Sequence, residues 1–524
     1  MARDIYSRLH LRGTLVTQSP LHVGGHGEEV DTDLPLARDG AGQLYVPGTS
    51  LAGALRELTE RLFGASVIDE LWGYQDGNKG HASFVVVEDA EIENSDKVVV
   101  EVRDHVGIDR EFGSAAENIK YDRAILPRGT KLKFRLSVDV ETQAKRNPAL
   151  AMLAALQEAL EAGEVRLGAA KTRGLGHVRL DSGQLTEQHF GSRQGILALL
   201  RQANGAVVSQ TDIEAATRDY KPRLRPRLTL KIHWQPIGPL MVKAGFDGIA
   251  ADMLPLVSGC DGQVSLVLPG SSVKGAFRSQ AERIVRTVRG ETSPSWLGGD
   301  GKKKFLDAVK LPLINELFGA AKQSAGEPHL GLGALGVMDC FGQHRLTAAQ
   351  WQAIQAADND QELRTALDSA GLQPWSQAYH VAIDRWLGSA AESLLFTVLE
   401  PHRTEWEPLR LEVDPSRLQP ACVAPALALL MLVIRDLAQG RLPLGFATNR
   451  GMGAVRIKTV EIEARDLSEL LNGSHSEARD LIESLKRFHS ATLPQGSLTG
   501  LPADLRHALN QAWQCWVKCD QEVS

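Results

Sequence analysis

Several features of secreted and membrane proteins are scarce in this 524-residue chain. Its five cysteines are odd in number, absent from the first 259 residues and never spaced as CxxC, which argues against a disulfide framework and a structural zinc site. The longest uncharged apolar run, residues 421–434, contains a proline and is too short to span a bilayer, so it predicts a buried helix. The N-terminus has no secretory pattern. We therefore expect a soluble protein of a reducing, cytoplasmic compartment with no membrane partner.

The chain also lacks an excess of positive charge. Its formal net charge is −6, which taken alone argues against a nucleic-acid partner, because a protein that follows phosphates needs Lys and Arg along their path. The nucleotide P-loop pattern GxxxxGK[ST] is absent. Many basic residues nevertheless fall inside recurring motifs, namely Arg56, Arg110, Lys171, Arg173, Lys274, Arg278, Arg385 and Arg450.

One long motif occurs twice in the same order. The first copy comprises residues 47–56 (PGTSLAGALR), 105–110 (HVGIDR), 113–117 (GSAAE) and 172–176 (TRGLG). The second comprises residues 269–278 (PGSSVKGAFR), 380–385 (HVAIDR), 388–392 (GSAAE) and 449–453 (NRGMG). This repetition indicates two copies of one domain, so whatever one copy binds, the protein should bind twice.

Apolar periodicity predicts the same elements in both halves. Strand, helix, strands, helix, glycine-rich turn and strand follow the βαββαβ order of an α+β, ferredoxin-like domain. We predict one domain at residues 1–184, a linker at 185–225, a second domain at 226–465 and a helical C-terminal extension at 466–524. The first two motif blocks are 58 residues apart in the first copy and 111 in the second, which predicts an insertion at about 290–375.

Two features of each copy could bind an anion. A helix starts at each Pro-Gly block, and its first turn offers unpaired N–H groups to a phosphate; ordinary capping by the Ser and Thr residues there is the alternative. The glycine-rich turns can present N–H groups beside an arginine, or they can be simple tight turns. The candidate RNA contacts are Thr49, Ser50, Arg56, Lys171, Arg173, Gly174, Gly176, Ser271, Ser272, Lys274, Arg278, Arg450, Gly451 and Gly453.

The His-Val-x-Ile-Asp-Arg segments predict a protruding hairpin in each copy. Apolar residues stand near both tips, where solvent-facing residues would be expected. They could wedge between bases, or they could cover their own hairpin, and the sequence leaves both alternatives open. The hairpin candidates are His105, Ile108, Arg110, Phe112, His380, Ile383, Arg385, Trp386 and Leu387.

Together with residues 21–25 (LHVGG) and 33–36 (DLPL), these motifs resemble the RAMP superfamily, specifically the backbone subunits of type III CRISPR effector complexes. The resemblance covers residues 8–182 and, more loosely, 226–463, like two fused subunits of a type III-D-like system. It implies that the core and glycine-rich loop hold guide RNA and that the hairpin "thumb" disrupts the guide–target duplex. It also implies target RNA and other type III effector subunits as partners.

The resemblance places a catalytic carboxylate at Asp33, in the loop after the first strand, where it is needed to cut target RNA. A carboxylate beside a kinked phosphodiester can orient the 2′-hydroxyl or hold a divalent metal, for which we expect Mg²⁺. Asp31 and His22 are neighbours that could assist. Without the resemblance, the sequence would favour a solvated loop carboxylate.

The second copy departs from this pattern. When residues are counted from Gly25 and Gly245, Asp252 falls at the position of Thr32. A one-residue shift is therefore needed to match Asp252 to Asp33, and His22 has no counterpart. Asp252 is the candidate of the second copy, with Asp247 behind it.

Three functions remain open at this stage. The leading prediction is a guide-RNA-binding backbone subunit that cuts target RNA at one or two sites as a metal-dependent endoribonuclease. A structural backbone that binds RNA without cutting predicts the same affinity. A guide-RNA-processing endoribonuclease is disfavoured, because a thumb-like segment in both halves suits stacking along a guide better than one processing site.

Overall fold

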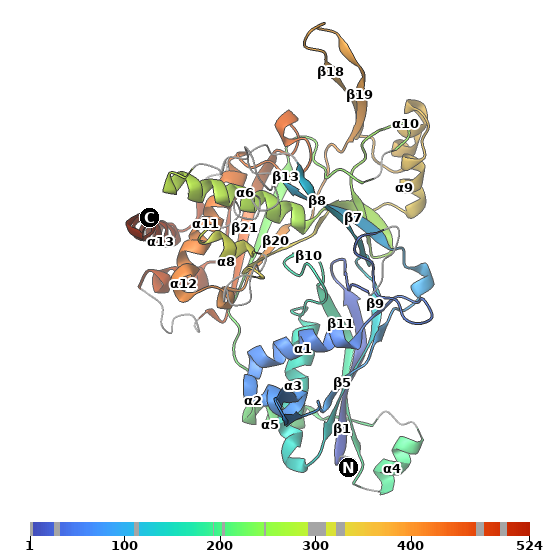
Figure 1. The fold of residues 1–524 in the computed structure, drawn as a ribbon, viewed down its shortest axis with the longest axis vertical. Helices are drawn as coiled ribbons and strands as arrows, with labels where there is room; N and C mark the ends of the chain where they lie inside the picture. The colour runs from blue at the N-terminus through green and yellow to red at the C-terminus, as the bar shows by residue number, and fades with distance from the viewer. Residues whose placement is uncertain are drawn as a thin grey trace. The chain divides into compact units, whose positions relative to one another are not determined.

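The protein is represented by a computed structural model. It describes residues 4–25, 32–108, 115–191, 193–201, 205–245, 248–291, 311–320, 331–467, 476–492 and 500–523. The chain divides into two compact units (Figure 1). The first comprises Met1–Val102, Asp122–Lys171 and Leu175–Arg225; the second comprises Arg103–Tyr121, Thr172–Gly174 and Pro226–Ser524. Two short segments from the first half of the sequence therefore belong to the second unit.

An antiparallel sheet forms the centre of the first unit, with the strand order β12-β11-β1-β9-β5. The strands are β1 (Ser7–Thr17), β5 (Val85–Val87), β9 (Lys131–Val140), β11 (Val178–His189) and β12 (Ala206–Val207). Alternation along β1 buries Leu9, Leu11 and Leu15 completely. Helices α1 (Gly48–Phe63) and α3 (Gln143–Glu161) share one apolar core with this sheet.

The sheet of the second unit has the order β10-β16-β20-β13-β21-β22. Its strands are β10 (Arg173–Gly174), β13 (Arg227–Pro236), β16 (Leu335–Met338), β20 (Leu409–Val413), β21 (Val455–Arg465) and β22 (Ser490–Thr492). Strands β16, β20, β13, β21 and β22 occupy the places of β5, β9, β1, β11 and β12. The helices α6 (Gly270–Arg289) and α11 (Pro420–Ala438) correspond to α1 and α3. The predicted pair of ferredoxin-like α+β domains is therefore confirmed.

The apolar helix α11 is the one helix in the described part of the chain that is long and apolar enough to cross a membrane. Its most apolar window has a mean hydropathy of 2.0, and 72% of that window is buried within the protein. It packs against α6, α12 (Ser476–Arg487) and α13 (Ala503–Val523). The prediction of a buried helix at residues 421–434 is confirmed.

Both sheets are extended after their last core strand. In the first unit, β12 pairs with β11 and α5 (Gln210–Asp219) packs on α3, so the predicted linker at residues 185–225 is packed onto its unit. In the second unit, β22 pairs with β21 and α13 packs on α11. The predicted C-terminal extension thus has a counterpart in the first half, because both segments add a strand and a helix at equivalent positions.

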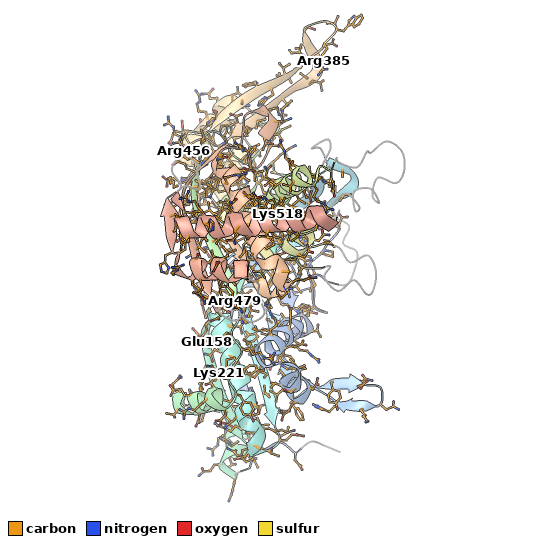
Figure 2. The ribbon with its side chains drawn as sticks, turned by 90° about the vertical axis from the view of Figure 1, so that its left-hand side faces the viewer. Glu158, Lys221, Arg385, Arg456, Arg479 and Lys518 are labelled. Atoms are coloured by element: carbon orange, nitrogen blue, oxygen red, sulfur yellow. The ribbon has the colours of Figure 1, made fainter. Side chains whose placement is uncertain are left out.

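Two hairpins form where the recurring His-Val motif predicts them. Their strands are β7 (Glu101–Ile108) with β8 (Ala115–Ile125), and β18 (Ser376–Ile383) with β19 (Ala390–Glu400). The β18–β19 hairpin projects from the second unit in Figure 1, and Figure 2 shows Arg385 near its tip. The residues Arg110 and Phe112 lie outside the described part of the chain.

The remaining elements are short. In the first half they are β2 (Tyr45–Val46), α2 (Ala65–Val67), η1 (Ile68–Trp72), β3 (Tyr74–Asp76), β4 (Lys79–His81), β6 (Ala90–Glu91), η2 (Ser95–Lys97) and α4 (Arg193–Leu200). In the second they are β14 (Val257–Cys260), β15 (Gln263–Leu268), α8 (Ile314–Phe318), β17 (Cys340–Phe341), α9 (Ala348–Gln355), α10 (Asp360–Ser369), η3 (Pro415–Arg417) and η4 (Thr448–Arg450). Helices α9 and α10 lie in the predicted insertion.

Candidate nucleic-acid interface

The loops that follow the opening strands have the same hydrogen-bond register in both units. Each loop closes with an antiparallel bridge between residues twelve positions apart, Gly24 to Leu36 in the first unit and Lys243 to Pro255 in the second. Asp33 and Asp252 both stand nine residues after the first member of the bridge. Asp252 is therefore the structural counterpart of Asp33.

Counting from Gly25 and Gly245 had misaligned the two loops by one residue, and the candidate Asp252 needs no shift to match Asp33. The amide of Gly25 donates to the carbonyl of Pro35, and in the second unit the amide of Ala244 makes the equivalent bond to Leu254. Gly25 therefore corresponds to Ala244, one residue before the glycine from which the sequence was counted. The two loops match without a shift.

Asp33 is exposed and is held by Asp122, at the base of the thumb strand β8. Its carboxylate accepts a hydrogen bond from the Asp122 amide at 2.9 Å, while the Asp122 carboxylate accepts one from the Asp33 amide at 2.7 Å. The Thr32 hydroxyl donates to the same Asp122 carboxylate at 2.7 Å. Each of the two carboxylates at the first site thus accepts the backbone amide of the other residue.

Asp252 is also exposed and is held by Thr397 of β19. Its carboxylate accepts hydrogen bonds from the amide of Thr397 at 2.7 Å and from the Thr397 hydroxyl at 2.9 Å. The Asp252 amide donates to the same hydroxyl at 2.9 Å. Each unit therefore fixes one aspartate to the outgoing strand of a thumb hairpin, and the second site has a hydroxyl where the first has Asp122.

His22 is buried rather than exposed beside Asp33. Its Nδ1 lies 2.7 Å from the carbonyl oxygen of Ala124, and burial lowers the pKa of the imidazole. A neutral ring that donates from Nδ1 satisfies this contact. The carbonyls of His22 and Met241 accept equivalent amides, which makes Met241 the counterpart of His22. This placement suits a side chain that positions β8. Asp31 and Asp247 lie outside the described residues.

The described residues contain no group of three or more His, Cys, Asp or Glu side chains that could hold a metal ion. Among the described residues, the first site offers the carboxylates of Asp33 and Asp122, and the second offers that of Asp252. Mg²⁺ commonly takes one or two protein carboxylates and fills its other positions with water and substrate phosphate. The residues present therefore fit a metal that RNA phosphates help to bind, and they do not form a complete protein site.

The glycine-rich turns expose an arginine in each copy, Arg173 and Arg450. The following glycines, Gly174 and Gly451, have φ angles of 99° and 90°, a conformation that L side chains rarely adopt. The next glycines, Gly176 and Gly453, are buried, and a Cβ on either would lie 2.1 Å from a carbonyl oxygen of its own unit. The second glycine of each turn is therefore needed for packing within its own unit. The arginine of the turn is the side chain available to a ligand.

Arg450 is surrounded by aromatic rings. Its guanidinium lies 5.3 Å from the centroid of Phe446 and 5.7 Å from that of Phe396. Phe396 also stacks on His380, with 5.3 Å between the ring centroids. Because Phe396 directly precedes Thr397, the glycine-rich turn, the hairpin base and Asp252 adjoin one another in the second unit. Lys171 is half-buried, with its ammonium 3.9 Å from Glu57.

The helix starts differ from the predicted capping. Helices α1 and α6 follow the N-cap residues Pro47 and Pro269 without a side-chain cap. The alternative of capping by Thr49, Ser50, Ser271 and Ser272 is therefore wrong, while their predicted contacts with RNA stay predictions. The carboxylates of Asp89 and Asp339 instead accept the amides of Gly48 and Gly270, at 2.6 Å and 2.8 Å. A carboxylate at each helix start opposes the predicted phosphate at the same place by like-charge repulsion.

Three basic residues predicted to contact RNA are used inside the units. Arg56 and Arg278 donate to the carbonyls of Gly73 and Gly319, at 3.1 Å and 2.6 Å, so they make equivalent bonds, although Arg56 is exposed and Arg278 is half-buried. Lys274 is 5% exposed and its ammonium donates to the Leu335 carbonyl at 2.6 Å. Sequence reasoning could not see these carbonyl partners. Lys274 is buried with its partner, whereas the RNA contacts predicted for Arg56 and Arg278 stay predictions.

The thumb residues divide into a packed base and an exposed tip. His105 stacks on Tyr121, as His380 does on Phe396. The apolar residues further out are exposed, with values of 41% for Ile108, 56% for Ile383, 94% for Trp386 and 74% for Leu387. The Asp384 carboxylate accepts the amides of Trp386 and Leu387 and fixes the turn. The second tip therefore presents apolar side chains to solvent and does not cover its own hairpin.

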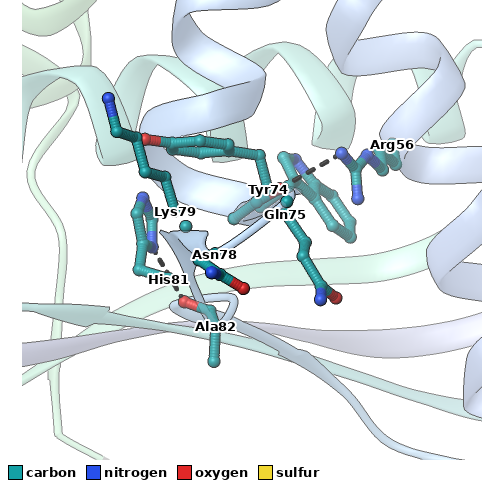
Figure 3. A pocket seen from close by; sticks show the side chains of 11 residues that line it. Arg56, Tyr74, Gln75, Asn78, Lys79, His81 and Ala82 are labelled. Carbon is teal, nitrogen blue, oxygen red and sulfur yellow. Dashed lines mark hydrogen bonds between the residues drawn. The ribbon is translucent and has the colours of Figure 1, made fainter.

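A polar hollow of about 760 Å³ beside the β3–β4 hairpin was not predicted (Figure 3). Arg56, Tyr74, Lys79 and His81 line it, and the rings of Tyr74 and His81 meet edge to face at 5.6 Å. The Gly-Asn-Lys turn at residues 77–79 is the signal that could have indicated an exposed hairpin there.

Comparison with known protein families finds a match in each half of the chain. A family model described as the RAMP superfamily matches residues 14–179 and 255–456, one region in each half of the chain. No curated protein matches the chain.

Proposed function

The chain belongs to the RAMP superfamily, and we propose that it is a guide-RNA-binding backbone subunit of a type III CRISPR effector complex that cuts target RNA at two sites. The family supports a CRISPR-associated RNA-binding subunit. Cleavage is the further step of the proposal. The observation that carries it is the matched placement of Asp33 and Asp252, each exposed and each hydrogen-bonded to the base of a thumb strand.

The carboxylates are suited to align a 2′-hydroxyl. Each accepts a backbone amide through one oxygen, which fixes the orientation of the carboxyl group while the side chain stays exposed. A carboxylate held in this way can accept the hydroxyl proton as the 2′-oxygen attacks phosphorus and the 5′-oxygen leaves. The products would be a 2′,3′-cyclic phosphate and a 5′-hydroxyl end.

Mg²⁺, held by Asp33 with Asp122 or by Asp252, would supply charge stabilisation at the phosphate. The exposed arginines of the glycine-rich turns supply the complementary binding function. In the second unit, Arg450 and the rings of Phe396 and Phe446 form a cationic and aromatic surface beside Asp252. Such surfaces bind phosphates and stack on bases without sequence preference, which suits a guide of varying sequence.

A structural backbone without cleavage is the second candidate. The absence of a complete metal site among the described residues favours it. The two functions share guide binding and assembly, and they differ only in whether the aspartates are required for cutting. A guide-processing nuclease is less well supported, because both halves contain a thumb hairpin and a corresponding loop aspartate.

The double variant Asp33→Asn and Asp252→Asn separates these functions. Asparagine keeps an oxygen acceptor for the Asp122 and Thr397 amides, so the fold and the bound guide RNA should be retained. Assembled complex carrying this variant should bind target RNA normally and lose all cutting in the presence of Mg²⁺, whereas the wild type yields fragments with 2′,3′-cyclic phosphate ends. Undiminished cutting by the double variant would leave the structural backbone as the function.

A further inference from the structure

The polar hollow beside the β3–β4 hairpin carries positive charge, and no carboxylate is among its described lining residues. Its volume of about 760 Å³ lies within the usual range of small-molecule sites, which is roughly 300–1,000 Å³. Lys79 is exposed, and its ammonium is unpaired within the described part of the chain. Together with Arg56 it gives the hollow two positive charges, which favour an anionic ligand.

Arg56 uses less of its guanidinium within the protein than its counterpart Arg278 does. In the second unit, Arg278 donates to a carbonyl and also to the side chains of Glu282 at 2.7 Å and Asn315 at 3.4 Å. Arg56 is exposed, and its one hydrogen bond within the described residues is to the Gly73 carbonyl at 3.1 Å. The remaining N–H groups can therefore bind a ligand, and a guanidinium fork matches the oxygens of a phosphate.

A buried donor in the wall of the hollow also lacks an acceptor. Trp72 lines the hollow and is 6% exposed, and its indole Nε1 has no hydrogen-bond partner among the described residues. Buried donors are normally satisfied, so an unsatisfied one beside a hollow points to an acceptor on a ligand. The corresponding residue of the second unit is Phe318, in the sequence ELFG at 316–319, and it has no such donor.

The hairpin adds an aromatic surface to the hollow. Tyr74 is 41% exposed, and its ring meets that of His81 edge to face at 5.6 Å. In the view of Figure 3, the Tyr74 ring lies between Arg56 and Lys79. The His81 Nδ1 lies 3.0 Å from the Ala82 carbonyl oxygen, so a neutral ring that donates this bond leaves Nε2 as an acceptor. An exposed ring between two cations can stack on a base whose phosphates the cations bind.

We propose that the polar hollow binds a nucleoside phosphate, supplied either as a free nucleotide or as the phosphorylated end of an RNA strand. Arg56 and Lys79 bind its phosphate groups, its base stacks on Tyr74, and the Trp72 indole donates to one of its oxygens. An inorganic anion would leave the ring unused, and an uncharged ring compound would leave the cations unused. The hollow lies within the first unit and contains neither loop aspartate, so the cleavage experiments do not affect this inference.

The first test measures which parts of the ligand are recognised. The purified full chain is titrated with labelled ATP, and inorganic phosphate and adenosine serve as competitors. ATP should bind at least about tenfold more tightly than either competitor, because each competitor lacks one set of contacts. A 5′-phosphorylated RNA dinucleotide is titrated in parallel, and the tighter of the two nucleotide ligands identifies the source. The proposal is overturned if neither binds, or if inorganic phosphate binds as tightly as both.

The second test assigns the binding to the hollow. Lys79→Met removes the charge and keeps a long apolar side chain, and it should weaken binding of the tighter nucleotide ligand by about tenfold. Tyr74→Leu removes the stacking ring and should weaken binding by about tenfold as well. Lys97→Met, at an exposed lysine of η2 in the same unit, is the control and should bind like the wild type. Wild-type affinity in either hollow variant contradicts the proposal.

Trp72→Phe separates binding from folding. Phenylalanine is the residue that the second unit has at the corresponding place, so the ring should still pack in the core. The measured quantity is the rise in melting temperature on adding the tighter nucleotide ligand, with each protein's ligand-free value as its baseline. This rise should be smaller for the variant than for the wild type at the same ligand concentration, because a donor to the ligand is lost. An equal rise would contradict the bond assigned to the indole.

Discussion

Asp33 and Asp252 derive their orientation from residues about ninety and one hundred and forty-five positions further along the chain. In both units the aspartate carboxylate accepts the amide of a thumb strand, and the aspartate amide is bonded to that residue's side chain. The pairing partner differs, Asp122 in one site and Thr397 in the other. The carboxylate is therefore the group that the two sites share, and the proposal assigns cleavage to it.

His22 and Met241 provide a test at the residue scale. Burial holds the pKa of His22 below its usual 6.5. As the pH falls through and below this value, the unfolded chain binds a proton that the folded chain does not, so the stability of the folded state decreases. His22→Met should reduce this loss, which melting temperatures at pH 5.5 and 7.5 would measure. The reciprocal Met241→His should make the second unit more sensitive to acid.

The same variant tests whether His22 takes part in catalysis. Since Met241 occupies the equivalent place in the second unit, His22→Met should leave both target cuts and their pH profiles unchanged. Loss of the Asp33-dependent cut in a variant that melts like the wild type at pH 7.5 would instead make His22 a catalytic group.

At the scale of elements, the proposal assigns guide binding to the glycine-rich turns. Arg173 and Arg450 are exposed, whereas Arg278 is directed to the Gly319 carbonyl. Changing Arg173 and Arg450 together to alanine should lower the guide RNA that co-purifies and reduce the salt slope of RNA binding by about two, because two phosphate contacts are lost. Arg456→Ala, at an exposed arginine on β21, is the control and should retain guide RNA (Figure 2). Guide RNA undiminished in the double variant would exclude these turns as guide contacts.

The tip of β18–β19 is expected to act on the target and not on the guide. Replacing Trp386 and Leu387 with serine removes two exposed apolar side chains without disturbing the stacked base of the hairpin. Guide retention should be unchanged. The Asp252-dependent cut should slow by about 100-fold, because the scissile phosphate is no longer bent into line. Single-turnover rates with labelled target RNA would measure this change. A variant that cuts at the wild-type rate would show that the tip does not contribute to cleavage.

Local sequence patterns were sufficient to predict the helices and hairpins. They were insufficient to predict which distant residues bond to them. The Pro-Gly blocks and the apolar spacing located α1 and α6, and the His-Val motif located both hairpins. The helix starts, however, are bonded to Asp89 and Asp339, which lie 41 and 69 residues away, and no adjacent residue reveals such a partner. The basic residues of these helices that donate to carbonyl groups are of the same residue types as RNA contacts. They differ from RNA contacts only in the groups that surround them.

At the scale of the whole molecule, the duplication of the domain could be predicted from the sequence. The boundaries of the two compact units could not. The family match and the two equivalent sheets agree with the repeat. The division into units does not follow the repeat boundary, because Arg103 pairs with Asp339 across 236 residues of sequence. No composition or periodicity signal marks such a contact. Gly245, which lies one residue after the counterpart of Gly25, also hid the register of Asp252, which the backbone hydrogen bonds define.

The most direct measurement maps the cuts made by each aspartate separately. End-labelled target RNA is incubated with Mg²⁺ and with complex that carries Asp33→Asn, Asp252→Asn or neither, and the fragments are resolved at single-nucleotide length. Two equivalent sites predict that each variant loses a different cut by about 100-fold or more and keeps the other. If both variants cut with the wild-type pattern and rate, the assignment of two catalytic aspartates is contradicted.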